Sequence, residues 1–93
     1  MVSTGMETLE LDPGPGPGAE ARLDALLAGR PETVCVALRV AEASRPGPGD
    51  LRRVGELALL VRRAGHRVVL RGAGERWRVL LELTGLAGAL PVE

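Results

Sequence analysis

Residues 34–64, VCVALRVAEASRPGPGDLRRVGELALLVRRA, decide the fold of this chain. The first seven residues are apolar apart from Arg39 and lead into a loop rich in proline and glycine, which predicts a short buried strand. Asp50 is a good N-cap and Gly65 a good helix stop, so the amphipathic segment between them predicts a helix. Because backbone N–H groups point outward where a helix begins, we expect function at the mouth of this loop.

The flanking segments extend this strand–loop–helix unit into an alternating chain. We expect a short edge strand at 8–11 and a helix at 19–28 before it. After it we expect a strand at 67–71, a helix at 75–84, and a last strand or packed tail at 86–92. Alternation of this kind calls for helices packed on a sheet. The predicted fold class is therefore α/β, a small, mixed but mostly parallel sheet of three to four strands with three main helices.

The last predicted helix has an apolar stripe and the only tryptophan of the chain. We expect Val79, Leu80 and Leu83 to face the core, with Gly85 at the C-terminal cap position. Trp77 is either the largest core residue or an interface anchor, and the core is the preferred interpretation.

Composition excludes several classes of partner. The chain has 93 residues, with 12 basic residues, 12 acidic residues and a formal net charge of zero. It therefore offers no general electrostatic case for nucleic acid or an anionic membrane. No apolar run approaches the roughly 20 residues of a membrane span. The N-terminus also lacks the pattern of a signal peptide. With a single cysteine, these features predict a cytoplasmic protein without direct membrane insertion.

Residues suited to catalysis are few. We interpret His66 as a hydrogen-bonded or exposed turn residue, and Cys35, inside the predicted central strand, as a small buried hydrophobe. One histidine and one cysteine cannot supply a tetrahedral metal site, and the glycines at 72–74 lack the rest of a dinucleotide fingerprint. We therefore assign no catalytic residue, no cofactor and no metal ligand. An enzyme or small-ligand binder, using an apolar pocket between helix and sheet, is the least favoured class.

Two Pro/Gly tracts punctuate the chain. Residues 12–18, DPGPGPG, predict a flexible or polyproline-like linker, with a ligand-binding glycine loop as the alternative. We accordingly divide the chain into an N-terminal strand and linker at 1–18 and a domain at 19–93. The second tract, 47–49, precedes a helix and could receive an anion, but Asp50 at the entrance favours the capping interpretation.

Three segments resemble a known family. They are AGHRVVL at 64–70, LLELTGL at 80–86, and the predicted helix at 21–27 followed by the strand at 34–40. In this order and spacing they resemble a STAS domain, the fold of bacterial anti-sigma-factor antagonists and of sulfate-transporter tails. The likeness covers roughly residues 19–92.

The sequence departs from the family at its phosphorylation motif. In STAS domains an Asp-Ser-Ser/Thr-Gly-Leu signature begins the second helix, and a partner kinase phosphorylates a serine in it. These positions fall on residues 47–51, where only Leu51 matches and the phosphate-accepting position is Gly49. The usual aspartate at the end of the central strand is replaced by Arg39. Ser44, the nearest hydroxyl, is a weaker alternative phosphorylation site.

The resemblance implies a non-catalytic protein-interaction module in bacterial transcription regulation. It would dock a protein partner, such as an anti-sigma factor or kinase-like ATPase, through the loop and the N-terminal half of the second helix, without a phosphoserine switch. The expected contact residues are Pro48, Gly49, Asp50, Arg52, Arg53 and Glu56. The alternative is a STAS-like accessory subunit of a membrane-associated transport ATPase assembly, with the same helix face packed permanently.

Overall fold

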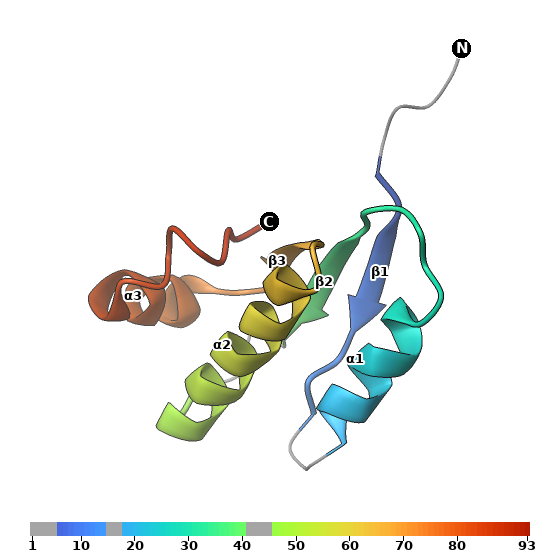
Figure 1. Cartoon of the computed structure of the whole chain (residues 1–93). Coiled ribbons are helices and arrows are strands. Elements are labelled where there is room, and N and C mark those ends of the chain that lie inside the picture. Colours follow the sequence, from blue (N-terminus) through green and yellow to red (C-terminus); the bar gives the residue numbers. More distant parts are fainter. Residues whose placement is uncertain (1–5, 15–17, 41–45) are drawn as a thin grey trace.

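A computed structural model describes residues 6–14, 18–40 and 46–93 of the chain. Its elements alternate as predicted (Figure 1). They are β1 (Thr8–Leu11), α1 (Ala19–Leu27), β2 (Cys35–Arg39), α2 (Pro48–Arg63), β3 (Arg67–Arg71) and α3 (Glu75–Thr84). The α/β class is confirmed. Within the described ranges, no helix is both long enough and apolar enough to cross a bilayer.

The sheet is parallel, with strands in the order β1-β2-β3. Its register aligns Leu11, Leu38 and Leu70 across the three strands. Beyond β3, the tail residue Val92 forms a parallel bridge with Leu70. The predicted three to four strands and the mostly parallel pairing are therefore present, and β1 belongs to the same sheet as the rest of the chain.

The core lies on one face of this sheet. Strand alternation directs Val36 and Leu38 to that face, and both are fully buried. Helices α1 and α2 bury their apolar stripes against the same face, and buried residues of α3 and the tail join them in a single cluster that includes all six elements. Its largest members outside the strands are Leu23, Leu57, Trp77, Leu81 and Leu90. Each such side chain contributes about 1.5–3 kcal/mol when it leaves water. Trp77, 2% exposed, is a core residue, as preferred from the sequence.

The start of α2 differs from the prediction. The helix begins at Pro48, with Gly47 as N-cap, so Asp50 lies in the first turn and is not the N-cap. Its carboxylate accepts a hydrogen bond from the Gly47 N–H at 2.9 Å. Proline favours an early start because its fixed φ suits the first helical position. Asp50 then satisfies the backbone donor from within the helix, as the acid of a capping box does.

The facing of α3 also differs from the prediction. Val79 and Leu83 are 47% and 77% exposed, so the expectation that they face the core is wrong, and Leu80 is only half-buried. Trp77 and Leu81, four residues apart, take the inner face instead. The indole is the largest side chain available, and its burial decides which side of the helix turns inward.

A close backbone approach fixes the turn after β3. Gly72 has φ +85°, and a Cβ there would lie 2.4 Å from the carbonyl oxygen of Val40, which follows β2. Gly65, before β3, has a similar φ of +87° but open space around it. The two glycines separate the cost of a left-handed backbone from the cost of a steric overlap.

We expect Gly65→Ala to lower the free energy of unfolding by about 1–2 kcal/mol. Gly72→Ala should lower it by about 1–3 kcal/mol more, because β3 must also move away from Val40. Urea unfolding of both variants measures the difference. Equal losses would contradict the close approach.

Candidate functional site

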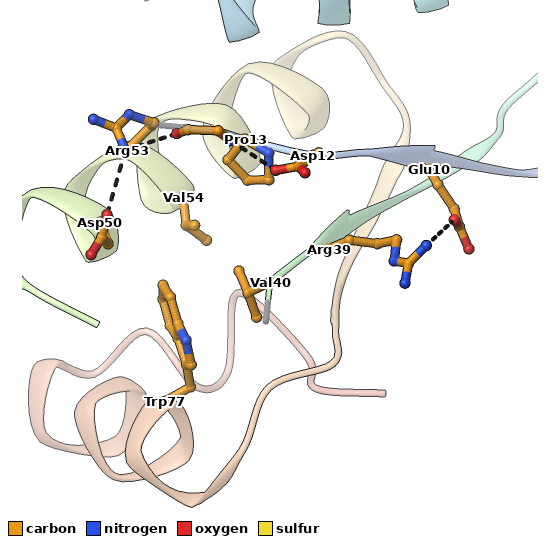
Figure 2. A pocket seen from close by; sticks show the side chains of 10 residues that line it. Glu10, Asp12, Pro13, Arg39, Val40, Asp50, Arg53, Val54 and Trp77 are labelled. Atoms are coloured by element: carbon orange, nitrogen blue, oxygen red, sulfur yellow. Dashed lines mark hydrogen bonds and ion pairs between the residues drawn. The ribbon is translucent and has the colours of Figure 1, made fainter. Parts of the chain in front are cut away.

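A cleft of about 740 Å³ opens at the carboxyl ends of β1 and β2 (Figure 2). Its walls come from both strands, from the segment after β1, and from α2 and α3. The lining residues are Glu10, Asp12, Pro13, Gly14, Arg39, Val40, Asp50, Arg53, Val54 and Trp77. Open α/β sheets bind ligands outside the carboxyl ends of their strands, which is the edge where this cleft lies, although the strand order β1-β2-β3 has no switch point to mark one position on that edge.

The cleft is apolar on one side and charged around its rim. In Figure 2 the Trp77 ring points from its helix toward Val54 and Val40. Three carboxylates and two guanidinium groups surround this apolar wall. Because acids and bases nearly balance, the cleft has no strong preference for an anion or a cation.

Arg53 connects two walls of the cleft. Its Nη1 donates a hydrogen bond to the Gly14 carbonyl oxygen at 3.0 Å and lies 3.5 Å from Asp50 Oδ1. Asp12 Oδ1 accepts a hydrogen bond from the Gly14 N–H at 2.9 Å. These contacts hold the segment after β1 against the first turns of α2. The sequence gives no sign of the contact between Arg53 and Gly14, because the two residues lie 39 positions apart.

The first Pro/Gly tract is therefore packed at its start. Pro13 is buried, and Gly14 is held by Arg53. The prediction of a flexible or polyproline-like linker does not describe these two residues. Residues 15–17, which complete the tract, lie outside the described residues.

The structure divides the predicted contact residues between two sides of α2. Asp50 and Arg53 line the cleft, whereas Arg52 and Glu56 line a shallow hollow beside the start of α1 that Arg53 also borders. Gly49 is exposed and lines the same hollow as Arg52 and Glu56. Pro48 is the first residue of the helix. The alternative phosphorylation site, Ser44, lies outside the described residues.

A second charged group covers the sheet face opposite the core. Glu10 pairs with Arg39 at 3.3 Å and with Arg71 at 2.7 Å, and Arg71 also pairs with Glu93. The hydrogen bond from Arg71 is the main reason why the pKa of Glu10 lies below its ordinary value, and the charge of Arg39 adds to it. These ion pairs connect all three strands and the tail. The sequence signal for this group is a charged residue at or next to the last position of each strand, Glu10, Arg39 and Arg71.

The structure shows the surroundings of the two residues considered for catalysis, His66 and Cys35. His66 Nδ1 accepts a hydrogen bond from the Val34 N–H at 3.0 Å, which confirms the hydrogen-bonded turn histidine. Partial burial raises the pKa of the Cys35 thiol, and the nearby charge of Glu93 raises it further. A raised pKa keeps the thiol protonated, whereas a nucleophilic cysteine needs the thiolate. Among the residues that the structure describes, no three His, Cys, Asp or Glu side chains are grouped to hold a metal ion.

Comparison with known proteins yields no relative: no family model, no curated protein and no solved structure matches this chain. The resemblance to STAS domains therefore stays a hypothesis that depends on the sequence segments quoted above.

We expect Arg53→Met to lower the free energy of unfolding by about 0.5–1.5 kcal/mol, because the Gly14 carbonyl loses its donor while the aliphatic stem is kept. Arg52→Met is the matched control. Arg52 makes no side-chain hydrogen bond within the described residues, so Arg52→Met should lower the free energy of unfolding by no more than about 0.5 kcal/mol. Thermal and urea unfolding report both values, and equal effects would contradict the role of Arg53.

The Glu10 ion pairs predict a pH dependence of stability. The folded-state pKa of Glu10 is lowered, so its contribution is present above the ordinary value of 4.5 and is lost as the pH falls through the folded-state pKa. Glu10→Gln should therefore lose less stability than the wild type when the pH drops from about 6 to about 3. Urea unfolding at a series of pH values provides the measurement. If the stability of both proteins fell by the same amount as the pH is lowered, the role of the Glu10 ion pairs would be refuted.

Proposed function

We propose that this chain is a non-catalytic protein-interaction module that docks a regulatory protein through the start of α2. It would act in the manner of an anti-sigma-factor antagonist but without a phosphoserine switch. The observation that carries the proposal is the exposure of Gly49, in the first turn of α2, with no atom within 4 Å of the space that a Cβ would fill. A partner can therefore approach the backbone closely at this point.

The side chains around Gly49 suit recognition of a protein. Asp50, Arg52 and Glu56 are all exposed within the first turns of the helix. Arg52 and Glu56 make no side-chain hydrogen bond or ion pair inside the described part of the chain, so both can pair with charges on a partner. Opposite charges one turn apart fix the orientation and the identity of a partner more than they add affinity.

Arg53 has a different role from its neighbours. Its guanidinium is already hydrogen-bonded to Gly14 and paired with Asp50. It therefore positions the first turns of α2 against the segment after β1. In this proposal Arg52 and Glu56 contact the partner, and Arg53 keeps the surface that carries them rigid.

The absence of a phosphoserine switch follows from Gly49. Under the STAS resemblance, the phosphate-accepting position falls on Gly49, which has no hydroxyl. A phosphate would add a charge of about −2 and repel or re-pair the partner. Without it, docking depends on the amounts of the two proteins. Ser44 stays the alternative acceptor.

The partner class comes from the resemblance alone. An anti-sigma factor or a kinase-like ATPase in the bacterial cytoplasm is the proposed partner. Affinity purification from the native cell, followed by mass spectrometry, identifies it. Recovery of a permease with its ATPase would instead support the accessory subunit of a transport assembly.

Once the partner is purified, Gly49→Glu tests the docking surface. The substitution should weaken binding about tenfold or more, or about 1.4 kcal/mol, because it buries an unpaired negative charge in the interface. Gly49→Gln, of the same size but neutral, should weaken binding less. Isothermal titration calorimetry measures both dissociation constants.

The fold should tolerate this variant, so the result reports on docking. Gly49 has open space around it and no positive φ, and an acid in the first turn of a helix is favourable. Gly88→Glu, at another open position in the tail, is the charge-matched control and should bind as the wild type does. Unchanged affinity of Gly49→Glu would exclude this surface.

A further inference from the structure

Helix α3 has an apolar stripe on its outer side. Leu83 is 77% exposed and Val79 is 47% exposed, while Leu80 between them is half-buried. Val79 and Leu83 lie on the side of the helix away from Trp77 and Leu81, and Leu80 lies on the flank between the two sides; the three residues are here called the α3 stripe. Single exposed leucines are ordinary, but apolar residues that adjoin at helical spacing form a continuous surface of the kind found at contact sites.

A hollow lies on the same side of α3, toward its N-terminus. Pro46, Glu75, Arg76, Val79 and Leu80 line it, and most of its surface is apolar. Its centre lies about one and a half turns before Leu83 along the helix. The α3 stripe therefore presents a projecting side chain at one end and a recess at the other.

We propose that the α3 stripe binds a second copy of this chain, with the two α3 helices antiparallel. A two-fold axis passing near Leu80 would seat each Leu83 in the hollow of the other copy. Such an interface is self-complementary, because the same patch supplies both the projection and the recess. The packing is that of a knob entering a hole formed by four side chains of the facing helix.

The charges on α3 favour the antiparallel direction. Arg76 lies near the start of the α3 stripe and Glu82 near its end, and neither forms an ion pair within the described ranges. Glu75 lies beside Arg76 at the start of α3, so the charges of these two side chains nearly cancel there. In an antiparallel pair, the positive end of each helix dipole approaches the end of the second α3, where Glu82 and the last carbonyl groups are negative. A parallel pair would instead bring the two negative ends together.

The self-association is separate from docking at the start of α2. The contact involves one helix of 10 residues and Pro46 in each copy, so the dimer is weak and depends on protein concentration. The test of the α3 stripe measures the mass of the protein alone, whereas the Gly49 test measures binding of another protein. Either proposal can therefore fail without the other.

Sedimentation velocity on the whole chain, from micromolar to millimolar protein, tests the proposal. The weight-average mass should rise with concentration toward twice the chain mass of 9.7 kDa. Leu83→Glu should stay monomeric over this range. Leu59→Glu is the matched control, because Leu59 is also exposed, at 48%, but belongs to α2; it should associate as the wild type does.

A mixture of two variants tests the antiparallel arrangement. Leu83→Glu and Val79→Arg should each associate poorly alone. Mixed together they should associate at least about tenfold more tightly, because the introduced charges meet across the two copies. A wild type that stays monomeric at every concentration would overturn the proposal, as would a Leu83→Glu protein that associates like the wild type. A mixture no tighter than its components would overturn the antiparallel geometry.

Discussion

The structure depends on the burial of one face of the central strand. Val36 and Leu38 of β2 are fully buried, and their neighbours in register on β1 and β3 complete an apolar surface that α1 and α2 cover. Parallel sheets are usually covered on both faces. Here the opposite face instead carries the ion pairs of Glu10 with Arg39 and Arg71. The asymmetry places α1 and α2, and with them the proposed docking surface at the start of α2, on one side of the sheet, while the ion pairs lie on the other.

The core determines where the first turns of α2 lie and which of their residues are exposed. Val54 and Leu57 anchor the inner side of the helix, and the hydrogen bond from Arg53 to Gly14 fixes its first turns against the segment after β1. The exposed residues Gly49, Arg52 and Glu56 therefore sit on a rigid support. Protein recognition benefits from such support, because less side-chain and backbone freedom is lost on binding.

Hydrophobic periodicity predicted the positions of the helices and strands well, but it predicted less well which side of each helix is buried. The strand at 67–71 and the helix at 75–84 were found at the predicted residues. The inward side of α3 was predicted wrongly, because several leucines compete for the core and only the burial of Trp77 decides between them. The N-cap prediction at Asp50 is wrong because Pro48 favours a helix start two residues earlier. The contact between Arg53 and Gly14 joins distant parts of the chain, and local patterns contain no information about it.

The central claim is that the first turns of α2 form the docking surface. Its most direct test is to map backbone amide resonances by NMR while the purified partner is added to the labelled chain. The largest changes should fall on residues 49–56, with small changes on the sheet face that carries Glu10 and Arg71. Changes centred on that sheet face, with residues 49–56 unaffected, would contradict it.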